Sequence, residues 1–171
     1  MGVVMDIRGP INADTAYCEG TLVGRNVTLT LPEVTHVLGT VQTALGEMEV
    51  PLFGLVEAME ATIQKIGVDS GLAKICAMKN KELEFRWAQQ VTTTNGESKT
   101  EGCKAFIKFM PKVAMPSLEI TPGESVELDI PGSVSRYRLV ANGKEILLVD
   151  KIAGICKING FDYANSLNSL L

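Results

Sequence analysis

The most regular alternation of apolar and polar positions lies in residues 81–110. Phe85 and Trp87 alternate with charged residues, which is the period-two pattern of a half-buried strand. The alternation returns after Asn95-Gly96, where every second residue of 103–109 is apolar. An Asn-Gly pair between two such runs is a strong hairpin signal. The sequence therefore predicts one long hairpin.

The pattern also constrains the register of this hairpin. A two-residue loop would place apolar and charged side chains together on each face. A loop of three or five residues centred on Gly96, or a bulge that restores the same phase, instead pairs Trp87 with Ala105. It also sets Glu84 opposite Lys108, a favourable cross-strand pair. We expect one of these odd-numbered loops.

The predicted hairpin is unusually long and has a polar end. Each of its strands has about 12 residues and would reach roughly 40 Å. The polar end contains Gln89, Gln90, Thr92, Thr93, Thr94, Ser98 and Thr100. A domain of 171 residues is too small to cover such a long hairpin completely. We expect it to project into solvent or to lie against another subunit.

A second hairpin is predicted for residues 134–152. Asn142-Gly143 forms its two-residue loop, for which a type I′ turn is expected. In this register Leu139 faces Ile146 and Tyr137 faces Leu148, giving one apolar face.

Weaker signals predict shorter elements. Residues 18–31 are β-rich, and Pro32 ends this run at a strand edge. Asp69-Ser70 is placed to cap a short helix. The expected elements are strands at 118–121, 125–130 and 154–158, a helix at 71–78, and a short helix or docked tail at 164–171.

Residues 33–53 are apolar, yet they match neither the helical nor the strand period well. Gly39, Gly46 and Pro51 interrupt them. A segment of this length without regular structure is uncommon inside a compact domain and is usually functional or bound to a partner. Packing on its own domain and packing on a neighbouring subunit both remain open.

Two further segments are ambiguous. Residues 54–67 favour a helix by propensity, although they can also be read as a strand. Residues 1–16 have no sustained period and are interpreted as an N-terminal arm with at most a short strand. The arm carries apolar residues that are expected to dock on another surface, namely Val3, Val4, Met5 and Ile7.

Composition indicates one globular domain, residues 1–171. The chain is 46% hydrophobic and 21% charged, which allows a sizeable core. Its net charge of −4 and pI of about 5.1 argue against a surface that grips nucleic acid. No segment resembles a signal peptide or an apolar membrane span. Synthesis in the cytoplasm without a membrane partner is therefore expected.

Signs of catalytic chemistry are few. Cys18, Cys76, Cys103 and Cys156 lack metal-binding spacing and are interpreted as free buried thiols. His36 is the only histidine, so histidine-based zinc sites and a complete Ser-His-Asp triad are nearly excluded. Phosphate-binding, dinucleotide-binding and hydrolase motifs do not occur. We expect no catalytic residue, no cofactor and no metal.

The order of several segments resembles the major tail-tube proteins of contractile-tailed bacteriophages. The similarity covers roughly residues 15–165. It is carried by VTLTLPEVT (27–35), ALGEMEVP (44–51), GLVEAMEATIQKIG (54–67), Tyr137-Arg138-Leu139, Asn142-Gly143-Lys144-Glu145, Val149-Asp150 and Gly160-Phe161-Asp162. Relatives of this family form the tubes of R-type bacteriocins and, more distantly, of type VI secretion systems.

The resemblance implies a mainly β (α+β) fold. The expected architecture is an antiparallel β-sandwich or partial barrel with long hairpins, one flanking short helix and a long apolar loop. It implies a strand at residues 57–66 and makes 33–53 an extended inter-subunit loop. Members of the family stack as hexameric rings into a hollow tube. The implied partners are other copies of the chain, the tail sheath protein, and the baseplate and tail-terminator proteins.

The resemblance also implies a location and a cargo. The protein would reside in a virion tail or a bacteriocin-like particle after synthesis in the host bacterial cytoplasm. DNA or effectors would pass through the lumen without specific binding. A soluble β-barrel module that binds a small ligand or peptide is the alternative function.

Two sets of residues are candidates for assembly. The expected subunit interface is the apolar part of 33–53, namely Val37, Leu38, Val41, Leu45, Gly46, Met48, Val50 and Pro51. Polar and acidic residues are expected to face the lumen, because bound cations would retain passing DNA. The candidates for this role are Glu60, Thr62, Gln64, Glu82, Glu84 and Gln90.

Overall fold

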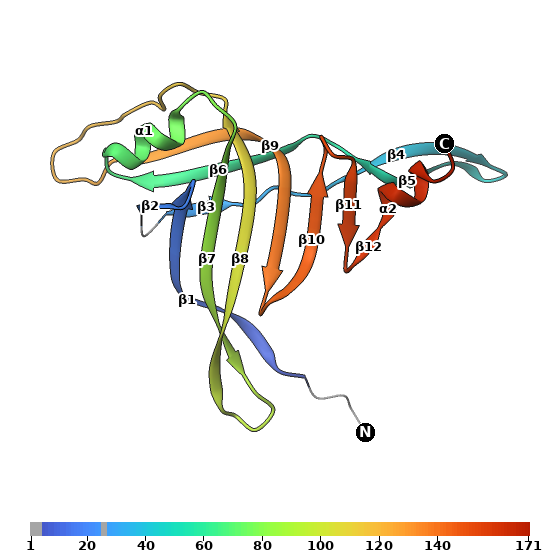
Figure 1. The fold of residues 1–171 in the computed structure, drawn as a ribbon, viewed down its shortest axis with the longest axis horizontal. Helices are drawn as coiled ribbons and strands as arrows, with labels where there is room; N and C mark the ends of the chain where they lie inside the picture. The colour runs from blue at the N-terminus through green and yellow to red at the C-terminus, as the bar shows by residue number, and fades with distance from the viewer. Residues whose placement is uncertain (1–4, 25–26) are drawn as a thin grey trace.

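A computed structural model describes residues 5–24 and 27–171 (Figure 1). Most of the chain is antiparallel strand, as the sequence predicts. The elements are β1 (Ile7–Cys18), β2 (Thr21–Gly24), β3 (Thr28–Thr30), β4 (His36–Thr43), β5 (Gly46–Val56), β6 (Met59–Ile66), α1 (Ser70–Cys76), β7 (Lys81–Thr92), β8 (Ser98–Pro111), β9 (Glu127–Ala141), β10 (Lys144–Asp150), β11 (Ile155–Ile158), β12 (Phe161–Asp162) and α2 (Tyr163–Asn168). Val3 and Val4 lie outside the described residues.

Strand β9 connects two parts of one sheet. Its first half pairs with β6, and its second half pairs with β8 and β10. Strands β7–β10 run side by side, and β6 crosses one end of them (Figure 1). The buried side chains of both parts form one core. Its least exposed members are Ala105, Ile63, Phe109, Leu128 and Ile130.

Gly132 makes the junction between the two parts possible. At this residue β9 pairs with both Ala61 of β6 and Pro111 of β8. A Cβ added to Gly132 would lie 2.2 Å from Cε2 of Phe109 and 2.8 Å from the carbonyl oxygen of Met110. The aromatic ring therefore occupies the space above the glycine, where no other residue fits.

The long hairpin forms with the predicted phase and a different register. Its loop comprises residues 93–97, and Thr92 pairs with Ser98. Trp87 consequently faces Cys103 rather than Ala105, and Lys108 faces Glu82 rather than Glu84. The predicted Glu84–Lys108 pair is therefore wrong. Apolar alternation could not detect the error, because a shift of two residues keeps every side chain on its face.

The second hairpin has the predicted turn and an unpredicted bulge. Asn142 and Gly143 have φ values of 49° and 78°, and a type I′ turn requires φ to be positive at both central residues. The register then shifts between Glu145 and Leu147. The predicted pairs of Leu139 with Ile146 and of Tyr137 with Leu148 are therefore wrong. Leu139 faces Leu147, and Tyr137 faces Val149.

Proline interrupts the sheet less than predicted. A single strand, β9, replaces the expected strand at 125–130 and the first strand of the second hairpin. Pro131 lies within it, opposite Thr62 of β6. Its carbonyl group accepts a hydrogen bond from the backbone N–H of Lys112 at 2.9 Å, so the strand keeps this contact although proline has no N–H to donate. The strand expected at 118–121 does not form.

The strand that the resemblance implies at residues 57–66 forms as β6, Met59–Ile66, against the helical propensity of 54–67. In β6 the apolar residues Met59, Ala61 and Ile63 are buried, and Glu60 between them is exposed. The pairing of β6 with both β3 and β9 places this alternation on a half-buried surface, and such tertiary context outweighs intrinsic propensity.

Residues 1–16 contain a longer strand than the sequence analysis predicted. Strand β1 begins at Ile7 and pairs with β7 along its length, with two irregularities between Arg8 and Ala13. Its outer edge is covered only near its end, where β2 pairs with residues 16–18.

Helix α1 forms as predicted and is closed at both ends. The Asp69 carboxylate accepts a hydrogen bond from the backbone N–H of Leu72 at 3.2 Å. At the other end Lys81, which is only 1% exposed, donates from Nζ to the carbonyl oxygens of residues 74, 75 and 77 at 3.0, 2.6 and 2.6 Å. The buried ammonium group thus satisfies carbonyl groups that the helix end leaves free.

Candidate assembly surfaces

The expected loop at 33–53 is in fact a projecting hairpin, β4–β5, which we call the arm. Its strands form a separate two-stranded sheet and extend away from the main sheet (Figure 1). The sequence signal for it is the alternation in residues 46–52, GEMEVPL, which Gly39 and Pro51 obscured in the whole segment. The prediction of an irregular loop is therefore wrong.

The arm has one apolar face. The register pairs Val41 with Met48 and Gly39 with Val50, so these side chains share a face. Val41 and Met48 are 46% and 52% exposed. The opposite face is polar toward the tip, where the Gln42 amide donates to the Glu47 carboxylate at 2.8 Å, and carries Leu38 and Pro51 nearer the base. Two-stranded hairpins are marginally stable alone, so this apolar face is suited to a partner.

The eight predicted interface residues all lie in the arm, within β4, within β5 or in the turn that joins them. Val37 and Val50 are half-buried, and the other six are exposed. Leu45, at the tip, is fully exposed. Exposed apolar residues gathered on one projection are typical of an interaction site.

The base of the arm is held firmly by α2 and the end of β10. The rings of Phe53 and Tyr163 stack at 5.7 Å between centroids. The Lys151 ammonium group donates to the carbonyl oxygen of Val56 at 2.9 Å. Gly54, with φ of 77°, lies so close to α2 that a Cβ would be 3.0 Å from Cα of Ala164. These contacts fix the direction in which the arm projects.

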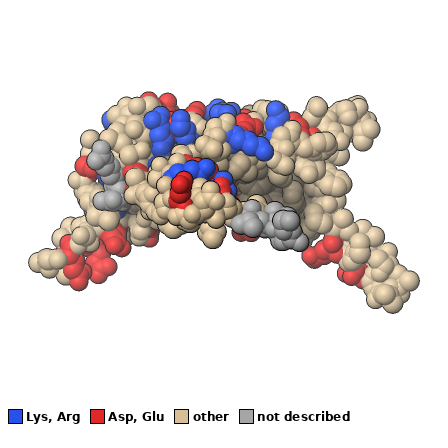
Figure 2. All heavy atoms as spheres, turned by 90° about the horizontal axis from the view of Figure 1, so that it is seen from below, with Lys and Arg blue, Asp and Glu red and all other residues tan. Residues whose placement is uncertain are grey.

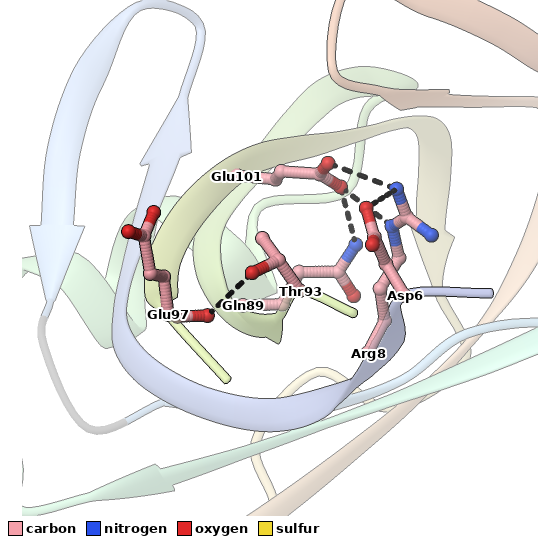
Figure 3. Close-up of polar contacts among 6 residues, drawn as sticks. All are labelled: Asp6, Arg8, Gln89, Thr93, Glu97 and Glu101. Carbon is pink, nitrogen blue, oxygen red and sulfur yellow. Dashed lines mark hydrogen bonds and ion pairs between the residues drawn. The ribbon is translucent and has the colours of Figure 1, made fainter. Parts of the chain in front are cut away.

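A second projection is the polar end of the β7–β8 hairpin. Here Arg8 of β1 reaches Glu101 of β8, with donor–acceptor distances of 2.9 and 3.1 Å (Figure 3). Gln89 of β7 donates to the same carboxylate at 3.5 Å. The loop closes where the backbone N–H of Thr93 donates to the carbonyl oxygen of Glu97 at 2.8 Å. Three strands are thereby joined at the tip.

The ion pair between Arg8 and Glu101 shifts the pKa of both side chains. Glu101 is 8% exposed. The hydrogen bonds and positive charge of Arg8 hold the pKa of Glu101 below its ordinary value, and the carboxylate raises the pKa of Arg8. Sequence alternation identified the polar tip but not this pair, because its partners are 93 residues apart.

The predicted lumen residues lie on two opposite outer faces. Glu60, Thr62 and Gln64 lie on the outer side of β6, whereas Glu82, Glu84 and Gln90 lie on the outer side of β7. The shared core separates these sides. Glu60 forms an ion pair with Lys112, and Glu84 accepts from Arg86 at 2.6 Å. One channel wall cannot contain both sets from the same subunit.

Charge also differs between the two sides of the molecule. Figure 2 shows most of the visible Lys and Arg side chains along one long side. At the two ends of the molecule the arm and the segment between β8 and β9 extend from the other side, and Asp and Glu side chains lie on both of them (Figure 2). The molecule is therefore arched, with its acidic projections on the concave side.

Burial raises the pKa of all four cysteine thiols, and all four cysteines are free. Residues 5–24 and 27–171 contain no cluster of three or more His, Cys, Asp or Glu residues that could hold a metal ion. No helix in the described part of the chain is long and apolar enough to cross a membrane.

Comparison with known proteins identifies the family. The family model described as phage tail tube protein FII matches residues 11–171. No curated protein sequence matches the chain. A chain of the PVC sheath–tube complex, from an extracellular contractile injection system in its extended state, has a TM-score of 0.51 at 12% identity and covers 77% of this chain and 90% of its own length. A chain of the PVC sheath/tube terminator structure has a TM-score of 0.51 at 10% identity, with 77% and 95% covered. At these identities the likeness concerns the fold.

Proposed function

This chain belongs to the phage tail tube protein FII family, and from that premise we propose that it assembles into stacked, six-membered rings that form the hollow tube of a contractile tail. It is a structural subunit, and assembly is its function. The observation that carries the proposal is the arm, β4–β5, whose apolar face is exposed although its base is rigidly held.

Within a ring, the arm of one copy packs on its neighbour. Burying the apolar face of the arm would remove Val41, Met48 and Leu45 from water, and burial of a large aliphatic side chain contributes about 1.5–3 kcal/mol. The outer edge of β1 between Ile7 and Thr15 has no strand partner among the described residues. Such an edge is available for pairing with another chain. Lateral contacts therefore involve the arm and this edge.

Between rings, the β7–β8 tip is suited to an axial contact. In the view of Figure 1 the tip points down and the arm extends to the right, so a molecule that uses the arm around a ring directs the tip along the tube. The Arg8–Glu101 pair keeps β1 attached to the tip. A three-stranded projection is stiffer than a free hairpin.

The arched shape suggests which side faces the channel. A segment of a ring is concave toward the axis, and the arm and the segment between β8 and β9 extend from the same side (Figure 2). We therefore assign Glu60, Thr62 and Gln64 to the channel wall and place Glu82, Glu84 and Gln90 on the outside. Acidic residues on the concave side repel phosphate groups, which suits a conduit through which DNA or a protein effector passes.

The tube would work inside a larger particle. The PVC structures that resemble this chain contain a sheath–tube complex and a sheath/tube terminator. By analogy, a sheath protein surrounds the tube, and terminator and baseplate proteins bind its ends. The particle is a virion tail or a bacteriocin-like tail.

Electron microscopy of concentrated purified protein tests assembly. We expect rings or hollow tubes for the wild type and only small oligomers for Val41→Ser/Met48→Ser. The control is Thr40→Ala/Glu49→Ala, which changes a directly paired position on the polar face of the arm and should still assemble. Tubes of normal length from the Val41/Met48 variant would contradict the role of the arm.

Cysteine labelling tests the channel assignment. All native cysteines are buried, so Gln64→Cys introduces the accessible thiol. A bulky maleimide–polyethylene glycol should label this thiol in subunits and largely spare it in intact tubes. Equal labelling before and after assembly would place β6 on the outside and overturn the assignment.

A further inference from the structure

The outer face of the main sheet carries a cluster of cations. We call it the outer basic face and define it by Arg86 of β7, Lys104 and Lys108 of β8, and Arg136 and Arg138 of β9. It lies on the side of the molecule where Figure 2 shows most Lys and Arg side chains. The whole chain has a net charge of −4, so this concentration of positive charge runs against the overall balance.

The strand register places like charges directly opposite each other. Arg86 faces Lys104 across β7 and β8. Lys108 faces Arg136 across β8 and β9. Like charges at directly opposite positions destabilise a sheet. Two such pairs on one face therefore reduce stability unless an anionic group lies between or above them.

Acidic side chains of the same face compensate only some of these cations. Arg86 pairs with Glu84 at 2.6 Å and Arg138 with Glu145 at 2.8 Å, and Arg136 reaches Asp150 only at 3.9 Å. Within residues 5–24 and 27–171, Lys104 and Lys108 make no ion pair within 4.0 Å. Glu82 lies directly opposite Lys108 across β7 and β8, yet the two side chains form no ion pair. These two lysines are available to an external anion.

The face also has an aromatic centre. Phe106 lies on β8 between the two lysines and is half-buried. The Arg138 guanidinium is 5.6 Å from the centroid of its ring. Aromatic and arginine side chains are enriched in protein–protein interfaces. The combination is typical of a surface that binds a folded or extended acidic protein segment.

We propose that the outer basic face binds an acidic segment of the sheath subunit that surrounds the tube. This inference rests on the proposed function, which places the convex side outward. A second copy of this chain is a poorer occupant, because the acidic projections extend from the opposite side (Figure 2). Nucleic acid that passes through the tube would move along the concave side and would not reach this face.

The first experiment measures cosedimentation of preformed tubes with the sheath subunit of the same particle. The test variant is Lys104→Glu/Lys108→Glu, and the control is Lys74→Glu/Lys79→Glu, which makes the same charge change at exposed positions near α1. We expect the test variant to bind sheath at least about tenfold more weakly, and the control to bind normally. Wild-type binding should also weaken at about 0.5 M salt, where surface charges are strongly screened.

Several outcomes are decisive. Unchanged sheath binding by tubes of the test variant, or an equal loss in the control, would overturn the proposal. Binding of a labelled single-stranded oligonucleotide that depends on both lysines, with sheath binding unaffected, would assign the face to nucleic acid instead. If the wild type forms no tubes at all, the proposed function fails, and this result is distinct from tubes that form but bind no sheath.

A second variant keeps the proposal testable if charge reversal prevents assembly. Lys104→Cys introduces one exposed thiol into a background of buried cysteines. Maleimide–polyethylene glycol should label it in bare tubes and not in extended particles that carry their sheath. Equal labelling in bare and sheathed particles would show that the sheath does not cover this face.

Discussion

The arm and the β7–β8 hairpin are built from the same pattern and have opposite surroundings. Both are antiparallel hairpins with one apolar face. In β7–β8 that face is covered: Leu83, Ile107 and Phe109 are at most 1% exposed. In the arm the equivalent face remains open, and Met48 is 52% exposed. Amphipathic alternation thus indicates that a face will be covered, without indicating whether the same chain covers it.

The difference follows from the neighbours of each hairpin. Strands β1 and β9 flank β7–β8, and β6 crosses its base. Among the described residues no further strand pairs with the arm, and its base contacts α2, β11 and Lys151. We therefore expect substitutions in β7–β8 to affect folding and substitutions in the arm to affect assembly.

The largest contrast should come from removing a core side chain. Phe109→Ala should lower the free energy of unfolding by about 3–5 kcal/mol, because it leaves a cavity at a fully buried position. Val41→Ala in the arm should change it by less than about 0.5 kcal/mol. Urea denaturation of the unassembled proteins measures both. A loss above about 2 kcal/mol for Val41→Ala would show that the arm is part of the folded core.

A second contrast concerns Gly132 of β9 and Gly102 of β8. Gly132→Ala should cost about 1–3 kcal/mol, because its Cβ would meet the Phe109 ring at 2.2 Å. Gly102→Ala, for which nothing lies within 4 Å, should have little effect. Thermal unfolding of both variants measures the difference, and equal losses would indicate that the junction repacks freely.

At the base of the arm, Gly54→Ala should cost about 1–2 kcal/mol from its positive φ. It should also loosen the contact with α2, so limited proteolysis should cut the arm faster. Gly123→Ala is the matched control, since it has a positive φ and nothing within 4 Å. Equal proteolysis of both variants would mean that α2 does not hold the arm.

The smallest expected effect is at the tip of β7–β8 and depends on pH. The pKa of Glu101 is lowered in the folded state by Arg8. Its stabilisation is therefore full above the ordinary carboxylate pKa of about 4.3 and is lost as the pH falls through the lower folded-state value. Urea denaturation between neutral and acidic pH should show a shallower decrease for Glu101→Gln than for the wild type. Identical profiles would show that the pair contributes nothing to stability.

Much of the local structure could be predicted from the sequence. Asn142-Gly143 supplied the type I′ turn, and Asp69 supplied the helix cap. In residues 81–110 the prediction of which side chains share a face was also correct. The resemblance identified the family, which the match over residues 11–171 confirms. Each of these features depends on backbone preferences or on side-chain period within a few residues.

Long-range pairing decided the remainder. The register of β7–β8 moved by two residues, a bulge changed the pairing beyond Glu145, and Pro131 was accommodated inside β9. A shift of two residues is invisible to alternation, and it brings Arg86 opposite Lys104. The outer basic face therefore could not be recognised before the strands were aligned.

By itself, the sequence determined which residues share a face, where the tight turns lie and where the helix begins, because these depend on local geometry. Only the tertiary structure decided which faces are covered, which charges meet and that the arm remains open, because those depend on which segments, distant in the chain, pack together.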